Sequence, residues 1–312
     1  MRLEAGAARG AAPIHDSTSG VTPAERTAMR EAIRLARRGV GGTHPNPRVG
    51  AVVLSEGRVA ARGWHVRAGE AHAEVRALDE AGAQARGGTL VVTLEPCAHH
   101  GRTPPCVDSI LASGIRRVVV GMVDPNPIVD GRGIEALRAA GLDVAVGVLE
   151  AECRTLNGPY LKALETGLPW VTLKAMLSLD GRLATDGGDS RGMGGAEEQR
   201  LCHRLRAEHD AVLIGSGTLL ADDPLLTVRL ARGRTPWRVV LDSSLRIPDG
   251  AAILGTTSVA PVIVATVARD ETRAAALEAR GARVWRFEAN AAGQVPLRPL
   301  LERLAGEGRY AL

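Results

Sequence analysis

Aromatic residues are scarce in this sequence: four Trp, two Tyr and one Phe make up 2% of its 312 residues. The hydrophobic cores must therefore be built from Ala, Val, Leu and Ile. Proteins that hold single-stranded nucleic acid usually stack its bases on aromatic side chains. The scarcity of such side chains therefore argues against a nucleic-acid partner.

Lysine is almost absent as well, because Lys162 and Lys174 are the only two in the chain. The formal net charge of +4 therefore comes almost entirely from arginine, whose planar guanidinium suits bidentate contact with phosphate. A modest excess that is spread along the chain is nevertheless typical of a solvated surface. The charge gives no separate reason to expect binding to nucleic acid.

No continuous apolar segment of the kind that a secretory signal requires occurs in the first twenty residues, and no later run is long enough to span a membrane. We therefore expect a cytoplasmic protein with no membrane partner. Thiols stay reduced in that compartment, where paired cysteines are more often metal ligands than disulfides. The chain has four cysteines: Cys97, Cys106, Cys153 and Cys202.

The length predicts two domains, each large enough for a core of its own. Residues 1–22 are rich in Ala, Gly and Ser without periodicity, and we expect a disordered tail there. Strand and helix patterns alternate in residues 23–168 and again in residues 169–312. This alternation predicts an α/β fold for both domains.

The predicted elements of the first domain are helices at 23–38, 71–81, 105–112, 134–140 and 151–164, and strands at 49–54, 59–65, 89–94, 117–123 and 144–148. Those of the second domain are strands at 170–176, 211–214, 238–241, 262–265 and 283–287, and helices at 196–207, 271–280 and 299–304. Residues 309–312 have the pattern of the opening of one more strand.

Zinc-ligand types gather between residues 72 and 106. His72 and Glu74 lie in the first turn of a predicted helix, Cys97 follows a predicted strand, and Cys106 opens the next predicted helix. A catalytic zinc ion takes three protein ligands, which His72, Cys97 and Cys106 can supply, and keeps one position for water. Glu74 is placed for proton transfer rather than for metal binding.

The same residue types also allow other interpretations. His99 and His100 are rival ligands, although we favour substrate contact or a surface loop for them, and Cys153 and Cys202 lack ligand spacing. A zinc ion that only stabilises the fold is one alternative. A base-editing deaminase that binds nucleic acid is another, but such enzymes have a Pro-Cys-x-x-Cys pattern, whereas eight residues separate the two thiols here.

The segment between the thiols makes the resemblance specific. Residues 94–106 read Leu-Glu-Pro-Cys-Ala-His-His-Gly-Arg-Thr-Pro-Pro-Cys, and His-Pro-Asn-Pro at 44–47, Gly-Glu-Ala-His-Ala-Glu at 69–74 and Asp-Pro-Asn-Pro at 124–127 accompany it. Together they resemble the RibD family, the bifunctional deaminase–reductases of riboflavin biosynthesis. The resemblance covers the chain from about residue 23 to its end and implies a cytidine-deaminase-like α/β/α sandwich for the first domain.

This resemblance implies a small phosphorylated pyrimidine as the partner, 2,5-diamino-6-(5-phosphoribosylamino)pyrimidin-4(3H)-one. Water activated by one zinc ion would attack the ring carbon that bears the 2-amino group, and ammonia would leave. Glu74 would be the catalytic residue that moves protons, and Asn46 would hold the substrate. Arginines near the pocket could contact the 5′-phosphate.

The second half resembles the family's reductase domain, which is similar to dihydrofolate reductase, on residues 173–182, 205–207, 210–218, 222–229 and 241–243. The resemblance implies that NADPH delivers hydride to the ribosyl group of 5-amino-6-(5-phosphoribosylamino)uracil. No Gly-x-Gly-x-x-Gly fingerprint is present, so a standard dinucleotide fold is not expected. By matched position the NADPH-binding residues are Met176, Gly192, Thr218, Asp222 and Ser243, and the substrate-binding residues are Ser190, Arg206, Leu226 and Arg229.

Two departures from the family pattern lie in this half. Gly192 stands where the family usually has an aromatic residue, and the family continues past a strand like 309–312 into a Glu-Gly-Gly loop and further strands. We therefore expect a C-terminally incomplete reductase domain that reduces poorly, with a deaminase whose second half is not catalytic as the alternative. The oligomeric state stays open, a homo-oligomer included.

Overall fold

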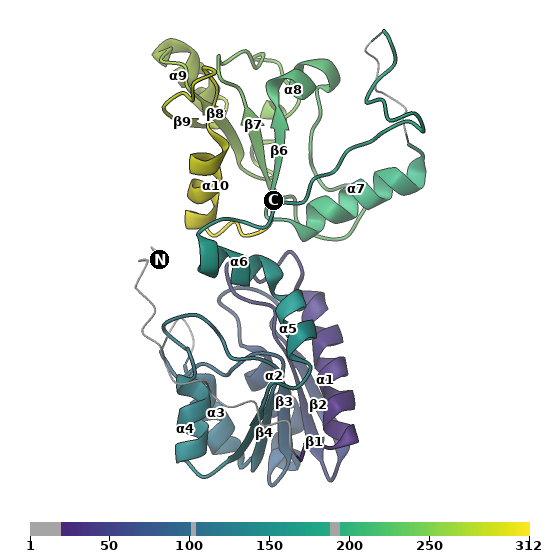
Figure 1. The fold of residues 1–312 in the computed structure, drawn as a ribbon, viewed down its shortest axis with the longest axis vertical. Helices are drawn as coiled ribbons and strands as arrows, with labels where there is room; N and C mark the ends of the chain where they lie inside the picture. Colours follow the sequence, from purple (N-terminus) through teal and green to yellow (C-terminus); the bar gives the residue numbers. More distant parts are fainter. Residues whose placement is uncertain (1–19, 101–103, 188–193) are drawn as a thin grey trace. The chain divides into compact units, whose positions relative to one another are not determined.

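The computed structural model describes residues 20–100, 104–187 and 194–312. The chain divides into two compact units, and the division falls between Glu165 and Thr166. Each unit has its own sheet and its own helices, which can be followed in Figure 1. Among the helices formed by the described residues, none combines the length and the apolarity that crossing a membrane requires.

The sheet of the first unit has the strand order β2-β1-β3-β4-β5. Strand β1 pairs antiparallel with β2 and β3, whereas β3, β4 and β5 run parallel to one another. The parallel strands read as short runs of Val and Leu because both of their faces are covered. The strand bounds are β1 Gly50–Ser55, β2 Arg58–Trp64, β3 Thr89–Val92, β4 Arg117–Val120 and β5 Asp143–Val146.

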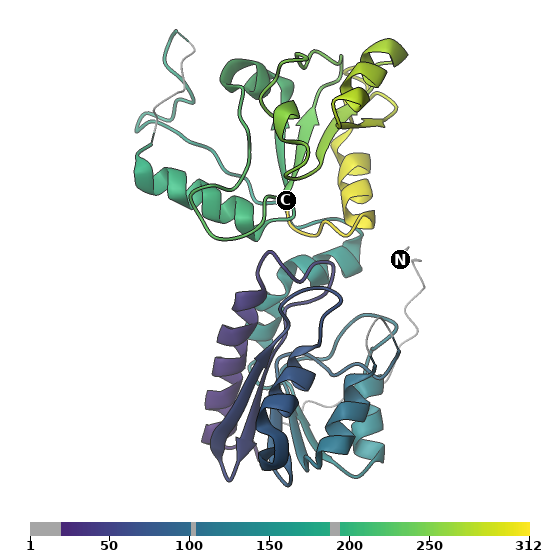
Figure 2. The same ribbon diagram turned by 180° about the vertical axis from the view of Figure 1, so that it is seen from behind.

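Helices cover both faces of this sheet (Figures 1 and 2). Helices α2, α3 and α4 pack against one face, where their apolar side chains share a core with alternate residues of all five strands. Helices α1 and α5 lie on the other face. The helix bounds are α1 Pro23–Ala36, α2 Ala73–Ala81, α3 Cys106–Ser113, α4 Arg132–Ala139, α5 Glu150–Leu156 and α6 Gly158–Thr166, with 3₁₀ turns at Arg37–Gly39 and Gly82–Ala85.

Small residues bring α2 close to the sheet. Ala73 and Ala77, four residues apart on one face of the helix, are fully buried. They face Gly63 on β2, where a Cβ atom would lie 2.1 Å from the carbonyl oxygen of Ala73 and 2.7 Å from the amide nitrogen of Ala77. Gly63 therefore sets the depth at which the start of α2, and with it Glu74, sits on the sheet.

The second unit contains a parallel sheet of order β6-β7-β8-β9. Helices α8 and α9 share a core with one face of this sheet, and α10 shares a second core with the other face. The bounds are β6 Ala211–Gly215, β7 Trp237–Leu241, β8 Val262–Thr266, β9 Arg283–Arg286, α7 Ala196–Glu208, α8 Ser216–Asp222, α9 Glu271–Ala279 and α10 Leu297–Gly306, with a 3₁₀ turn at Leu254–Thr256.

The predicted strand at 170–176 is wrong. Only Trp170 forms a bridge, parallel to Ala311, and Thr172 donates its N–H to the carbonyl of Leu312 at 2.7 Å. Beyond Thr172, no strand among the described residues pairs with this segment. Its apolar side chains therefore stay in solvent, and Leu173 is 92% exposed. Of the strand expected at 309–312, the structure forms the bridge at Ala311, whose carbonyl oxygen also accepts the N–H groups of Asp210 and Ala211 at 2.8 and 3.2 Å.

The single helix predicted at 151–164 is also wrong, because the structure has two helices, α5 and α6, that break at Asn157. The buried Asn157 side chain accepts from the N–H of Arg48 at 2.8 Å and donates to the carbonyl of Arg48 at 3.0 Å. These two hydrogen bonds join Asn157 to the loop before β1, which is remote in the sequence, so no local sequence pattern indicates the break between the helices. Helix α8 was missed, since its Gly-Ser-Gly-Thr start has the composition of a turn.

We predict that Gly63→Ala destabilises the first unit by about 1–3 kcal/mol, the usual cost of forcing extra atoms into a packed contact. The Cβ atom would overlap the backbone of α2, which cannot move without displacing the helix. Urea unfolding followed by circular dichroism measures the effect. Gly250→Ala is the matched control, because its Cβ would meet nothing within 4 Å. Equal stability of the two variants would contradict this account of the α2 position.

Candidate active site

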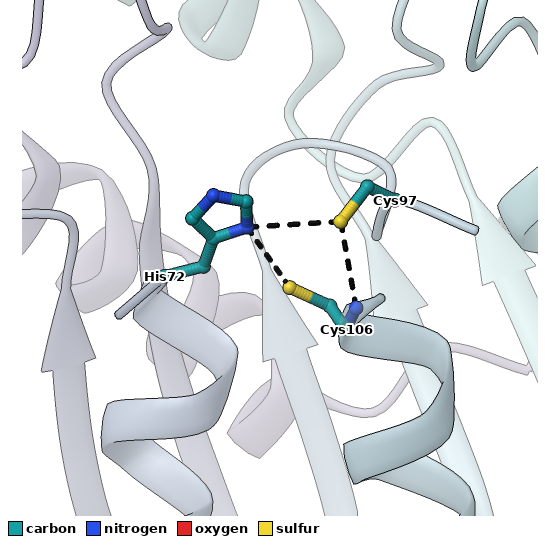
Figure 3. Close-up of side chains that lie close together, drawn as sticks. All are labelled: His72, Cys97 and Cys106. Atoms are coloured by element: carbon teal, nitrogen blue, oxygen red, sulfur yellow. Dashed lines mark hydrogen bonds between the residues drawn. The ribbon is translucent and has the colours of Figure 1, made fainter. Parts of the chain in front are cut away.

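Three potential metal ligands from separate parts of the first unit come together (Figure 3). His72 is the residue before α2, Cys97 lies in the loop after β3, and Cys106 is the first residue of α3. His72 Nδ1 is 3.1 Å from Cys106 Sγ and 3.7 Å from Cys97 Sγ, and the three ligand atoms all lie within 4.8 Å of one another. The carboxyl end of β3 and the starts of two helices thus meet at one point.

The donor set fits a tetrahedral zinc ion. With Zn–N near 2.0–2.1 Å and Zn–S near 2.3 Å, neighbouring ligand atoms lie roughly 3.5–3.8 Å apart, close to the separations in the structure. In the parts of the chain that the structure describes, His72, Cys97 and Cys106 are the one group of at least three such ligands. The rival ligands His99 and His100 are outside that group, and His100 is exposed.

The three ligand side chains share hydrogen bonds that move their pKa values in different directions, and only the thiol of Cys97 is shifted toward the deprotonated form that binds metal. A hydrogen bond from the Cys106 side chain lowers the pKa of Cys97 to about 4, whereas the same contact and burial raise the pKa of Cys106. The hydrogen bond with Cys97 raises the pKa of His72. Two thiols and an imidazole thus hold protons between them, and a divalent cation would take the place of those protons.

Glu74 lies beside this group in the first turn of α2 and is 3% exposed. Burial raises the pKa of its carboxyl group to about 7, although the neighbouring His72 acts in the opposite direction. Its Oε2 atom is buried and has no hydrogen-bond partner among the described residues. A carboxyl group that titrates near neutral pH and has a free oxygen can both take and return a proton.

Two further residues hold the site together and were not found from the sequence. Glu95, two residues before Cys97, is 4% exposed and accepts four backbone N–H groups of the 124–134 segment at 2.8 to 3.3 Å. His65, the residue after β2, contacts Asn46 through Nε2 at 3.1 Å and packs edge-on against the His72 ring. The partners of both residues are remote in sequence. The only local signals were the position of His65 at the end of a predicted strand and that of Glu95 directly before Pro-Cys.

Two family models match the chain: the cytidine and deoxycytidylate deaminase zinc-binding region over residues 23–122, and the RibD C-terminal domain over residues 169–311. The riboflavin biosynthesis protein RibD of Aquifex aeolicus is 47% identical over 261 residues, which cover 83% of this chain and 73% of that protein. RibD of Bacillus amyloliquefaciens is 45% identical over 83% of this chain and 70% of its own length. The chain belongs to the RibD family.

Solved structures of the same family agree. A diaminohydroxyphosphoribosylaminopyrimidine deaminase/5-amino-6-(5-phosphoribosylamino)uracil reductase from Thermotoga maritima is 37% identical, with a TM-score of 0.81 over 92% of this chain and 79% of that one. RibD of Acinetobacter baumannii gives 39% and 0.82 over the same shares. These matches confirm the predicted fold, a cytidine-deaminase-like unit and a dihydrofolate-reductase-like α/β unit, and the RibD-type pairing of deaminase and reductase domains with zinc and NADPH as cofactors.

The predicted NADPH-binding residues of this RibD-family chain are distributed over three places. Thr218 and Asp222 lie on α8, which follows β6 directly, and Ser243 lies two residues after β7. These positions share the carboxyl edge of neighbouring parallel strands, where α/β proteins commonly bind ligands. Met176 lies in the exposed segment after Thr172, and Gly192 lies outside the described residues.

Two of the predicted substrate-binding residues of the reductase half, Arg206 and Arg229, lie near His203 on α7. His203 Nδ1 accepts the N–H of Arg229 at 2.9 Å, and Arg206 lies one turn further along the helix. Burial lowers the pKa of Arg206, and the positive charge of Arg229 adds to the effect. Two neighbouring guanidinium groups suit a phosphate. Leu226, three residues before Arg229 in the sequence, is buried, and Ser190 lies outside the described residues.

We predict that Cys97→Ser abolishes zinc retention. A serine hydroxyl does not ionise near neutral pH and cannot replace the thiolate, so zinc content after dialysis should fall from about one ion per chain to nearly none. Elemental analysis by inductively coupled plasma mass spectrometry measures it. Cys202→Ser is the matched control, since Cys202 lies on α7 outside the ligand group. Full zinc retention by Cys97→Ser would contradict the assignment.

Proposed function

We propose that this chain carries out two successive steps of riboflavin biosynthesis. The first is hydrolytic deamination of 2,5-diamino-6-(5-phosphoribosylamino)pyrimidin-4(3H)-one in the first unit. The second is NADPH-dependent reduction of the ribosyl group of 5-amino-6-(5-phosphoribosylamino)uracil to ribityl in the second unit. The two activities named for the Thermotoga maritima protein support both steps.

The observation that carries the deaminase step is the pairing of Glu74 with the three ligands. A buried carboxyl group with a pKa of about 7 and an unpartnered oxygen lies next to His72, which shares the ligand group with Cys97 and Cys106. Zinc held by these three residues would lower the pKa of water to about 7 and make hydroxide available at neutral pH.

Glu74 then handles the protons of the reaction. It accepts one proton from the attacking water and passes it to a ring nitrogen, and then accepts the proton of the added hydroxyl group and passes it to the departing amino nitrogen. A C–O bond forms, the C–N bond breaks, and ammonia leaves while the ring carbon becomes a carbonyl carbon. Asn46, on the loop before β1, holds the pyrimidine by its amide group during these steps.

In the reductase step, the proposed roles divide between two groups of residues. Thr218, Asp222 and Ser243, at the carboxyl edge of the sheet, contact NADPH. Arg206 and Arg229 hold the 5′-phosphate, since each guanidinium is otherwise without an acidic partner among the described residues. NADPH would supply a hydride to the ribosyl C1′ and become NADP⁺, the bond between C1′ and the ring oxygen would break, and that oxygen would take a proton from water, which leaves a ribityl chain.

We predict that Glu74→Gln lowers kcat for deamination by roughly 10²–10⁴-fold while zinc content stays unchanged. The amide keeps the size of the side chain but cannot move protons. A coupled assay of ammonia release with the diaminopyrimidine phosphate measures the rate. Glu80→Gln on the same helix is the control, because Glu80 is exposed. A Glu74→Gln variant with normal activity would instead favour a zinc ion that only stabilises the fold.

The second unit has one feature that favours slow reduction. Met176 lies on a segment that itself forms neither a helix nor a strand among the described residues, and Leu177 and Leu179 beside it are 55% and 111% exposed. Residues that bind a cofactor need a rigid support to be positioned to within about 0.5 Å. This observation favours the alternative in which the 312-residue chain deaminates its substrate but has a weak or inactive reductase half.

We therefore predict that the 312-residue chain has a kcat/KM for NADPH oxidation at least about tenfold below that for deamination, which corresponds to an activation free energy ~1.4 kcal/mol higher. Zinc-replete protein is assayed with the diaminopyrimidine phosphate, with and without NADPH, following ammonia and the absorbance at the NADPH band. Reduction as fast as deamination would contradict this prediction and leave the deaminase assignment untouched.

The proposal includes a small phosphorylated pyrimidine, rather than nucleic acid, as the substrate. It also includes a cytosolic location for the protein. The long segment between Cys97 and Cys106 and the few aromatic residues support the first. The need for two reduced thiols at the ligand group supports the second. Salt-dependent binding of RNA by the purified chain would count against the choice of substrate.

A further inference from the structure

Both ring nitrogens of His65 are in contact with polar groups. This residue is 2% exposed, just beyond the end of β2. Its Nδ1 lies 3.3 Å from the carbonyl oxygen of Ala71, and its Nε2 lies 3.1 Å from Nδ2 of Asn46. Its ring also meets that of His72 edge-on, with centroids 5.2 Å apart. His65 therefore links the loop of Asn46 to the segment that carries the metal ligand.

These contacts fix the orientation of the Asn46 amide. A carbonyl oxygen only accepts hydrogen bonds, so Nδ1 of His65 carries the hydrogen and donates it to Ala71. In the neutral ring Nε2 then has a lone pair, which accepts from the NH₂ group of Asn46. Oδ1 of Asn46 is left as the free end of the amide, and no described residue donates a hydrogen bond to it.

We propose that His65 is a positioning residue that makes Asn46 present a hydrogen-bond acceptor to the pyrimidine. The inference rests on the proposed function, in which Asn46 holds the substrate. The 2-amino group of the substrate and its adjacent ring nitrogen carry N–H donors, which an acceptor can bind. In the product a carbonyl oxygen replaces the amino group and would face the same acceptor unfavourably. The Ala71–His65–Asn46 chain therefore makes the site prefer the amino substrate to the oxo product.

Two substitutions separate this role from packing. The Oε1 atom of Gln reaches about as far as Nε2 of His and can accept from Asn46, whereas Asn reaches only about as far as Nδ1. We expect His65→Asn to raise KM for deamination about five- to tenfold, the effect of one lost hydrogen bond, with a smaller change in kcat. We expect His65→Gln to restore most of the loss. Zinc content, measured on each purified holoenzyme, should stay the same because His65 is not a ligand.

A double-mutant cycle with Asn46→Ala tests the coupling. If His65 acts through Asn46, then His65→Asn adds little to the KM of Asn46→Ala, and each variant loses part of the discrimination between substrate and product in an inhibition assay. If His65 only supports the fold, His65→Asn raises KM or lowers the melting temperature equally in both backgrounds. That result would overturn the proposal, as would equal KM values for His65→Asn and His65→Gln.

The tautomer can be measured without any turnover. A long-range ¹H–¹⁵N correlation spectrum of the zinc-loaded chain, with the His65 signals assigned by their loss in His65→Gln, should show hydrogen on Nδ1 and a lone pair on Nε2. The opposite tautomer would overturn the inference even if the enzyme deaminates. The expected tautomer in a chain that does not deaminate would overturn the proposed function and leave the Ala71–His65–Asn46 geometry in place.

Discussion

The hydrogen bonds of one buried carboxylate hold the zinc-ligand loop against the rest of the first unit. Oε2 of Glu95 accepts the N–H groups of Asp124 and Gly131 at 3.2 and 2.9 Å, and Oε1 accepts those of Gly133 and Ile134 at 2.8 and 3.3 Å. An anion at the start of α4 satisfies donors that a helix leaves free and interacts favourably with its dipole. Burial raises the pKa of Glu95, and these N–H groups oppose that rise. Because Cys97 is two residues away, the position of this thiol depends on the same contacts.

Close backbone approaches, rather than large side chains, complete the arrangement. A Cβ atom on Gly133 would lie 1.8 Å from the carbonyl oxygen of Pro96, and one on Gly63 would overlap α2. Both glycines lie where a helix that belongs to the site meets the sheet or the ligand loop. The scarcity of aromatic residues is consistent with this mode of packing, since Ala, Val and Gly allow helices and strands to approach closely. The rigidity of the site therefore comes from backbone contacts that tolerate little change in volume.

The sequence predicted those parts of the structure that local pattern determines. His72, Cys97 and Cys106 were found because ligand chemistry requires particular residue types at helix and strand ends, and the parallel strands were found because continuous apolar runs mark them. Glu95 and His65 were missed because their partners lie remote in the chain, and the break at Asn157 was missed for the same reason. The strand predicted at 170–176 failed for a different reason. Its apolar pattern is that of a strand, but a strand also needs a neighbour to pair with, and the described residues supply one only as far as Thr172.

The charges of the site explain why Glu74 is suited to its proposed role. Two thiolates and a neutral imidazole balance a divalent cation, so the ligand group of His72, Cys97 and Cys106 has almost no net charge once the cation is bound. Burial is the largest cause of the rise of the pKa of the Glu74 carboxyl group to about 7, and the negative charge of Cys97 adds to that rise. A third anionic ligand in place of His72 would add a negative charge and raise that pKa further, which would keep Glu74 protonated and unable to accept a proton from water. The choice of one histidine and two cysteines is therefore linked to the proton chemistry of the residue beside them.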